Sequence, residues 1–200
     1  MKRGKMIAIY GINGIGKTTQ MELLVEYLKS KGKNAIRLKY PIYDLKSEGP
    51  FIHKYLRDPE FRQRNELNAE ALQKKYADNR ERYEPELKRK LDAGIWIVAE
   101  DYTGTGIAWG LTRGADFEYL EKINSRLFKE DLSILMHGNR FLTAIEADHK
   151  NETDIEAIKI CKNFLFLLAG RYGWKIVNAN RKIKAVHAGI IGTVAGYLLK

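Results

Sequence analysis

The sequence predicts a three-layer α/β protein, in which helices cover both faces of a five-stranded parallel sheet. Strands that alternate with helices favour parallel pairing through right-handed crossovers. Five short apolar segments bounded by glycine or polar residues predict the strands, at residues 6–10, 35–40, 95–99, 132–136 and 174–177. Longer amphipathic segments predict helices at residues 18–31, 67–93, 154–172 and 183–199.

Each helix follows from the spacing of its side chains. Residues 18–31 place four apolar side chains on one face and end before Gly32, which stops a helix. Residues 67–93 form a long charged segment whose larger side chains recur every three or four positions, and the last two helices follow the same logic. The apolar face of the first helix comprises Met21, Leu24, Val25 and Leu28, and the recurring positions of the second are Leu72, Tyr76, Arg80, Tyr83 and Leu87.

The chain of 200 residues shows no internal repeat and no break in composition, so one domain over residues 1–200 is expected. Its net charge of +10 favours anionic partners, which include nucleotides, phosphates and nucleic acid. Because the lysines and arginines are spread along the chain, the basic surface of a small enzyme is favoured over a nucleic-acid-binding face.

The location of the protein is indicated by what the sequence lacks. A single cysteine, Cys161, excludes an internal disulfide and a cysteine-based metal cluster, and its apolar surroundings predict a buried thiol. The first five residues run into a strand pattern without a signal peptide, and the low-charge stretch at residues 185–199 is too short to span a membrane. We therefore expect a cytoplasmic protein with no membrane partner.

The strongest motif follows the first predicted strand. The segment Gly11-Ile-Asn-Gly-Ile-Gly16-Lys17-Thr18 fits the phosphate-binding pattern Gly-x-x-x-x-Gly-Lys-Ser/Thr at every fixed position, with a strand before it and a helix after it. Glycines let the backbone turn tightly, so that amide hydrogens and the start of a helix converge on phosphate oxygens. Lys17 is expected to reach the β- and γ-phosphates of ATP, and the Thr18 hydroxyl to ligate Mg²⁺.

This loop occurs in several classes of protein. A small GTPase would carry an Asn-Lys-x-Asp motif, which the sequence lacks, and a motor ATPase would usually be larger. The small size and single phosphate loop therefore favour a small-molecule kinase that uses ATP and Mg²⁺. A basic ATPase stimulated by nucleic acid remains the alternative from a different class, motivated by the net charge.

Two further features suit nucleotide chemistry. Tyr76 and Arg80 lie four residues apart on one helix face, where they are able to hold a planar base by stacking and a directed donor. A surface pair is the alternative interpretation. Glu100 ends the third predicted strand, at the edge where open α/β sheets bind ligands. Glu100 either orients Mg²⁺ through water or forms a structural ion pair.

Taken together, these segments resemble the thymidylate kinases, P-loop nucleoside monophosphate kinases that phosphorylate dTMP to dTDP with ATP and Mg²⁺. The likeness runs from the loop to the last helix. It is carried by Lys17-Thr18-Thr19-Gln20, Lys39-Tyr40-Pro41-Ile42-Tyr43, Tyr76-Ala-Asp-Asn-Arg80, Glu100-Asp101-Tyr102-Thr-Gly-Thr105-Gly106-Ile-Ala-Trp109 and the segment 173–187. The part after Tyr102 is similar to a small-residue turn of that family.

The resemblance implies a P-loop fold with a small lid at about residues 138–153, and a homodimer. Lys17 and Arg140 would be catalytic, and Thr18 and Glu100 would hold the metal. The implied ATP-binding residues are Gly11, Asn13, Gly14, Ile15, Gly16, Lys17, Thr18, Thr19 and Arg181. The implied acceptor-binding residues are Asn13, Lys39, Pro41, Tyr76, Arg80, Asp101, Tyr102, Thr105, Gly106 and Trp109.

The sequence also departs from the family pattern around the acceptor phosphate. Asp101 stands where the family has an arginine, and Ile42 and Tyr43 follow the pocket proline where a basic residue is common. A carboxylate repels a phosphate dianion, so Lys39 is the first choice as the replacing cation, unless Asp101 points away and pairs with a neighbouring basic residue. A deoxynucleoside kinase of similar fold, whose acceptor is a hydroxyl, is therefore the nearest alternative.

The lid is atypical as well. The family places an arginine in the phosphate loop or in the lid, and here the loop has none because position 14 is glycine. Arg140 and Lys150 are the candidates in the lid, and the planar guanidinium of Arg140 suits bidentate phosphate contact better. The alternative for Arg140 is a helix cap.

Overall fold

A computed structural model describes residues 2–141 and 150–198 of the chain. Its centre is a five-stranded sheet in the order β2-β3-β1-β4-β5, and every neighbouring pair is parallel. The central strand β1 is buried along its whole length, as expected for a parallel sheet covered on both faces. The strands are β1 (Met6–Tyr10), β2 (Ala35–Lys39), β3 (Trp96–Glu100), β4 (Leu132–His137) and β5 (Lys175–Asn178).

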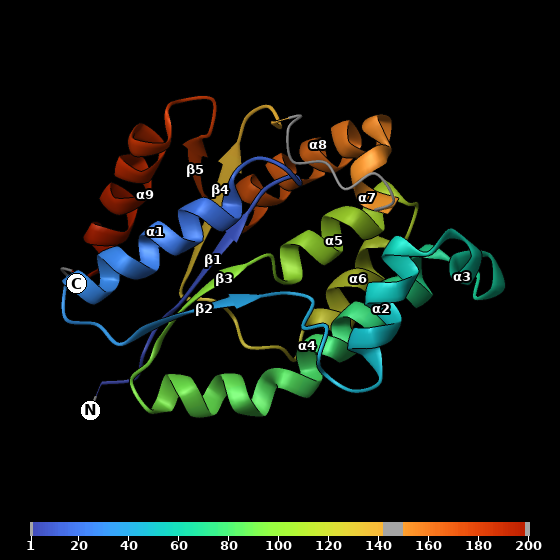
Figure 1. Cartoon of the computed structure of the whole chain (residues 1–200), viewed down its shortest axis with the longest axis horizontal. Helices are drawn as coiled ribbons and strands as arrows, with labels where there is room; N and C mark the ends of the chain where they lie inside the picture. Colours follow the sequence, from blue (N-terminus) through green and yellow to red (C-terminus); the bar gives the residue numbers. More distant parts are fainter. Residues whose placement is uncertain (1, 142–149, 199–200) are drawn as a thin grey trace.

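Helices connect the strands and form the outer layers (Figure 1). One face of the sheet is covered by α1 and α9, which pack on each other, and the other face by α4, α5 and α8. The bounds of these helices are α1 (Lys17–Ser30), α2 (Glu48–Arg57), α3 (Pro59–Arg64), α4 (Ala69–Asp92), α5 (Thr103–Thr112), α6 (Phe117–Asn124), α7 (Lys150–Thr153), α8 (Ile155–Tyr172) and α9 (Ile183–Leu198).

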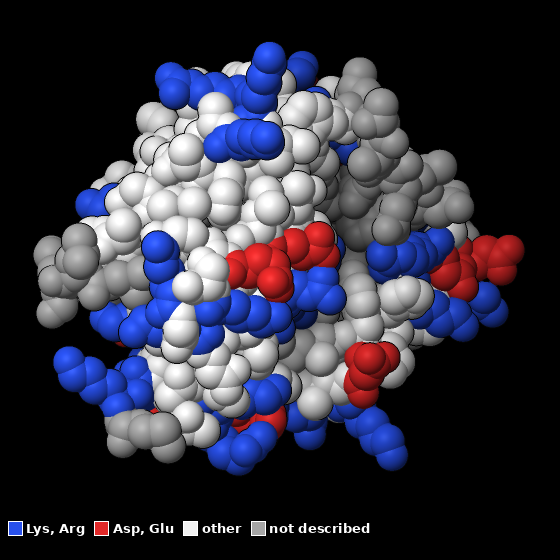
Figure 2. Space-filling model, turned by 60° about the vertical axis from the view of Figure 1, so that its left-hand side comes forward, with Lys and Arg blue, Asp and Glu red and all other residues white. Residues whose placement is uncertain are grey.

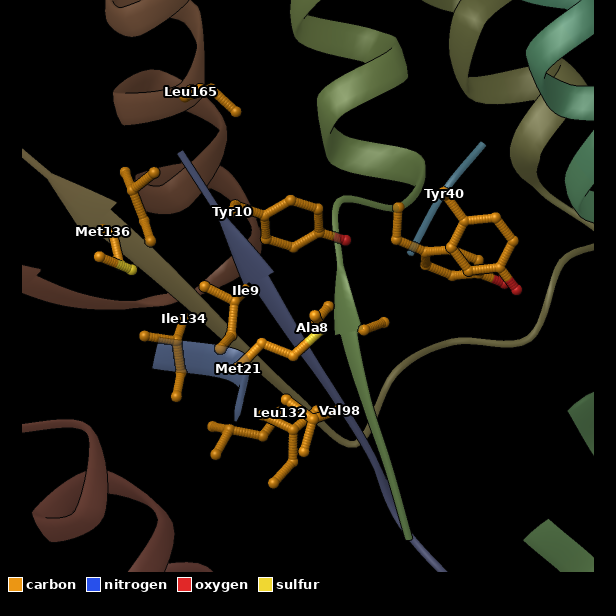
Figure 3. Packing of buried hydrophobic residues seen from close by; sticks show 14 of the residues in the cluster. Ala8, Ile9, Tyr10, Met21, Tyr40, Val98, Leu132, Ile134, Met136 and Leu165 are labelled. Atoms are coloured by element: carbon orange, nitrogen blue, oxygen red, sulfur yellow. The ribbon is translucent and has the colours of Figure 1, made fainter. Parts of the chain in front are cut away.

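The hydrophobic core joins the sheet to both helical layers. Figure 3 shows Ile9 and Ile134 on neighbouring strands, with Met21 coming from α1 and Leu165 from α8. Tyr10 extends from the end of β1 toward α5, and its hydroxyl donates a 2.5 Å hydrogen bond to Glu130. Cys161 is fully buried in the same core, as the sequence predicts. Within the described part of the chain, no helix is both long and apolar enough to cross a membrane.

The predicted strands and long helices are confirmed, with ends that differ by no more than two residues. The short helices α2, α3, α6 and α7 were not predicted, because each is too brief to show a clear period. Local capping explains two of them: Asp58 accepts from the amide of Phe61 at the start of α3, and Asp116 caps α6 in the same way.

One expectation from the sequence is wrong. The small-residue turn expected after Tyr102 is the helix α5, which packs against α4, α6 and α8. Its glycines make an isolated helix unfavourable, but burial between three helices overrides this local preference.

Gly104 of α5 illustrates how tightly this helix is packed. A Cβ atom at this position would lie 2.3 Å from Cη2 of Trp174 and 3.1 Å from Cε1 of Tyr10. These two rings are stacked, with centroids 4.2 Å apart. Only a glycine lets α5 approach this aromatic pair without moving it.

We therefore predict that Gly104→Ala lowers the free energy of unfolding by about 1–3 kcal/mol, because the added methyl group displaces Trp174. The matched change Gly192→Ala on α9, where a Cβ atom meets nothing within 4 Å, should raise it by about 0.5–1 kcal/mol. Urea unfolding followed by circular dichroism measures both. Equal stability of the two variants would contradict the packing described for α5.

Candidate active site

The phosphate loop lies between β1 and α1, at the edge where the parallel strands end. Gly11, Gly14 and Gly16 have φ angles of 152°, 73° and 90°, which residues with a side chain rarely adopt. Gly16 is also the residue that precedes α1, so backbone amides rather than a side chain face the space in front of the helix. Such amides and the helix dipole attract anions.

Lys17 is buried at the start of α1, with 4% of its surface exposed. Its ammonium donates to the carbonyls of Gly11 (2.9 Å) and Ile12 (3.1 Å) and lies 3.7 Å from the carboxylate of Asp101. These contacts hold the charge over the loop, next to the position of any bound phosphate.

Glu100 connects the loop to the neighbouring strand β2. Its carboxylate accepts a 2.7 Å hydrogen bond from the Thr18 hydroxyl and lies 3.2 Å from Nζ of Lys39. The second contact follows from the sheet register, because Lys39 is the partner of Glu100 in the β2–β3 pair. Although burial alone opposes the charged form of Lys39, the carboxylate of Glu100 raises its pKa above the ordinary value.

Asp101 has a φ angle of 60°, in the region that favours glycine. Its carboxylate accepts a 2.7 Å hydrogen bond from Thr105 and faces Lys17. Burial raises the pKa of Asp101, an effect that Lys17 opposes and Glu100 reinforces. Asp101 thus pairs with a basic neighbour, the lysine of the phosphate loop, but it lines the cleft rather than pointing away from it.

The long helix α4 supplies a second set of side chains on the far side of Asp101. Arg80 is buried, and its guanidinium donates to Asn124 Oδ1 (3.0 Å) and to the Tyr102 carbonyl (3.5 Å). Burial lowers the pKa of Arg80, but a guanidinium keeps its charge at neutral pH. Tyr76 lies one turn earlier on the same face of α4, as its spacing predicts.

One cleft of about 550 Å³ joins the phosphate loop to this face of α4. Its two ends are chemically different: backbone amides and lysine at one end, aromatic rings with a buried arginine at the other. The lining contains most of the residues expected from the sequence, namely Asn13, Gly14, Gly16, Lys17, Thr18, Thr19, Lys39, Pro41, Tyr76, Arg80, Glu100, Asp101, Tyr102, Thr105, Gly106 and Trp109.

Four expected residues lie outside the lining. Gly11 is beneath the loop, where its carbonyl binds Lys17, and the side chain of Ile15 is buried in the core with 1% exposed. Arg181 is exposed between β5 and α9, so its contact with ATP stays a prediction. Arg140 lies at the described start of the lid region.

The described start of the lid region lies against the phosphate loop. A Cβ atom at Gly14 would be 3.6 Å from Nε of Arg140, and the amide of Phe141 donates a 2.7 Å hydrogen bond to the Gly14 carbonyl. Arg140 therefore occupies the space beside the loop that a side chain at position 14 would otherwise fill. The rest of the predicted lid up to residue 149, and the side chain of Lys150, are outside the described residues.

The lining also contains polar residues that the sequence did not identify, namely Arg57, Gln73, Arg113 and Asn151. Arg57 ends α2, a helix that was not predicted. Gln73 lies three residues before Tyr76 on the predicted face of α4, so its spacing was a usable signal. Arg113 forms a 2.9 Å ion pair with Asp154 and links α5 to the start of α8.

The oxygens near the loop fit Mg²⁺. Thr18 Oγ1 and Glu100 Oε2 are hard donors 2.7 Å apart, and Mg²⁺ prefers one or two such protein oxygens together with substrate phosphates. No cluster of three or more histidine, cysteine or acidic side chains suited to a metal occurs in the described part of the chain. Such a cluster is not needed by a metal that is bound largely through phosphates.

The fold and the loop define a P-loop nucleotide-binding protein. The thymidylate kinase family profile matches residues 9–190, and the chain belongs to this family. It is 29% identical to the thymidylate kinase of Plasmodium falciparum over 96% of this chain and 90% of that one. The corresponding values are 27%, 94% and 89% for the thymidylate kinase of Danio rerio, and 29%, 98% and 98% for the probable thymidylate kinase of Pyrococcus horikoshii.

A solved structure supports the fold. The thymidylate kinase of Candida albicans superposes with a TM-score of 0.78 at 20% identity, over 98% of this chain and 92% of that one. The family uses ATP as phosphate donor. Figure 2 shows lysines and arginines interspersed with acidic side chains on the face in view, rather than gathered in one stripe.

The pKa of Asp101 leads to a prediction for Asp101→Asn. In the unfolded chain this carboxyl ionises near its ordinary pKa of about 3.9, whereas in the folded protein it ionises only at higher pH. The wild type therefore loses unfolding free energy as the pH rises through this interval, and the neutral variant does not. The stability of Asp101→Asn relative to wild type should increase as the pH rises above about 4.

Urea unfolding at several pH values measures this difference, and Asp92→Asn at the exposed end of α4 is the control. A variant that becomes less stable than wild type as the pH rises would show that the ion pair with Lys17 outweighs the burial of Asp101.

Proposed function

We propose that this protein transfers the γ-phosphoryl group of ATP to dTMP, giving dTDP and ADP. The observation that carries this proposal is the continuous cleft that joins the phosphate loop to the Tyr76–Arg80 face of α4. A phosphoryl donor and a planar acceptor bound at its two ends would meet above Lys17 and Asp101. The names of the relatives support the choice of dTMP.

On the donor side, catalysis is attributed to positioning and charge neutralisation. The loop amides and Lys17 would hold the β- and γ-phosphates, and Thr18 and Glu100 would hold Mg²⁺. When bound, Mg²⁺ offsets negative charge on the phosphate oxygens. Arg140, beside Gly14, is the lid cation proposed to stabilise charge on the transferring group.

On the acceptor side, Tyr76 stacks on the base and Arg80 donates to its edge. Thr105 and Trp109 of α5 complete the walls of this end of the cleft. Because Thr105 already donates its proton to Asp101, its oxygen remains an acceptor for the substrate.

The acceptor phosphate needs a cation, since Asp101 stands in place of the family arginine. Lys39 is the residue expected from the sequence, but Glu100 already offsets part of its charge. Arg57 also lines the cleft, with its guanidinium carbon 5.3 Å from the ring centroid of Tyr43 and its Nη1 3.4 Å from the Tyr43 hydroxyl. Arg57 thus brings a cation to Tyr43, which stands where the family often has a basic residue. We assign Arg57 the larger share of phosphate binding.

The nearest alternative is a deoxynucleoside kinase, in which Asp101 would face a hydroxyl instead of a phosphate. The homodimer and the cytoplasmic location expected from the sequence stay predictions.

A coupled assay of ADP release tests the proposed function. With ATP and Mg²⁺, the wild type should phosphorylate dTMP and leave thymidine unreacted. Activity on thymidine but on no nucleoside monophosphate would establish the alternative. Lys17→Met should lower kcat by at least about 100-fold, because it removes a cation from the transferring phosphate. The exposed Lys29→Met on the same helix is the control and should retain full activity.

A second assay compares the two candidate cations. Arg57→Met should raise KM for dTMP by about 10- to 100-fold with little change in KM for ATP, as expected for the loss of a charged hydrogen bond to phosphate. Arg64→Met, on the exposed helix α3, is the control. If Lys39→Met raised KM for dTMP more than Arg57→Met did, Lys39 would be the main cation that binds the acceptor phosphate.

A further inference from the structure

Gln73 is a buried polar side chain in the wall of the cleft, and the proposed mechanism does not use it. Only 5% of its surface is exposed, and it lies on the same face of α4 as Tyr76 and Arg80. Within the described part of the chain, no group donates a hydrogen bond to its Oε1 atom. Buried amide oxygens almost always have a donor, so an oxygen of this kind at the wall of a binding cleft is suited to a donor on the ligand.

Two glycines of α5 fix the position of this amide. A Cβ atom at Gly110 would lie 3.1 Å from Cγ of Gln73, and a Cβ atom at Gly106 would lie 3.1 Å from its Oε1. The side chain of Gln73 therefore rests against the backbone of α5. A glutamine held in this way presents its amide in one position at little further cost in entropy.

Arg80 lies beside this amide. The same Cβ point at Gly106 is 2.8 Å from Nη2 and 3.3 Å from Nη1 of Arg80. Near Gly106, the wall thus offers donors from a guanidinium and an acceptor from an amide, side by side. The cation also favours the orientation in which the oxygen of Gln73, rather than its NH₂ group, is turned toward Arg80.

Adjacent donor and acceptor groups match the edge of only some bases. Thymine and uracil carry an acceptor, O4, next to a donor, N3–H. Cytosine has the reverse pattern, with an amino donor at C4 and an unprotonated N3 acceptor. Cytosine at this wall would place its amino donor against the guanidinium, which is also a donor. Its unprotonated N3 would face the amide oxygen, which is also an acceptor, so both pairs would be unfavourable.

We propose that Gln73 is a specificity-determining residue, whose Oε1 accepts the N3–H of a 4-keto pyrimidine while Arg80 donates to O4. This inference rests on the proposed function, because it assigns the acceptor end of the same cleft. It adds a base contact from a residue outside the motifs that carry the family resemblance. It also gives a reason for a buried amide at the position next to Gly106.

The test replaces Gln73 by methionine, which has a similar shape but no hydrogen-bonding amide. The KM for dTMP and for dUMP should rise by about 10- to 100-fold, because a buried N3–H then lacks an acceptor. The KM for ATP should not change, and the inhibition constant of dCMP against dTMP should not rise. KM and inhibition constants do not depend on the fraction of folded enzyme, so partial unfolding would not imitate this pattern.

Two further variants complete the experiment. Gln73→Glu keeps an acceptor oxygen and should retain most of the preference for dTMP over dCMP. If Gln73→Glu lost as much of this preference as Gln73→Met, the assignment of Gln73 as acceptor would be overturned. Lys74→Met, the exposed neighbour on the same helix, should leave every constant unchanged. Equal weakening of dTMP and dCMP by Gln73→Met would reduce Gln73 to a structural residue. Absence of dTMP turnover in the wild type would instead overturn the proposed function itself.

Discussion

The arrangement of this site depends on the contacts of one buried carboxylate, that of Glu100. It accepts a hydrogen bond from Thr18 at the start of α1 and pairs with Lys39 at the end of β2. A buried carboxylate without partners is strongly unfavourable, so the register of β2 against β3 and the position of the phosphate loop are fixed together. The same contact therefore aligns the sheet and holds the oxygens suited to a metal at its edge.

The charges at this edge are balanced before any substrate binds. Lys17 and Lys39 lie against Asp101 and Glu100, so two cations face two carboxylates. A triphosphate and an acceptor phosphate add several negative charges, which this balanced set does not neutralise. Stabilisation of the substrates must therefore come from the amides of the loop, the dipole of α1 and cations outside this set. Arg57 in the lining of the cleft and Arg140 beside the loop are the cations proposed for this role.

The sequence was sufficient for the parts of the fold that have local signals. The spacing of apolar side chains predicts the strands and the long helices. The eight consecutive residues from Gly11 to Thr18 predict the phosphate loop. Arg57 had no such signal, because its place beside Tyr43 depends on how the short helix α2 packs. Gln73 had the correct spacing on α4, but it differs from an ordinary helical glutamine only in its buried oxygen, which accepts no hydrogen bond from the residues that the structure describes. The roles of charged residues such as Asp101 likewise depend on contacts between distant segments.

The helix α5 shows why local preference failed where the site is built. Its three glycines cost about 1 kcal/mol each in an isolated helix, so the segment resembles a turn when its sequence is considered alone. In the folded protein, however, Gly106 and Gly110 admit the side chains of Arg80 and Gln73, and Gly104 admits the Tyr10–Trp174 pair on another side. The close packing of α4 against α5 thus requires small residues in α5. The segment that is least helical by composition is therefore the one that lets α4 pack closely beside the cleft.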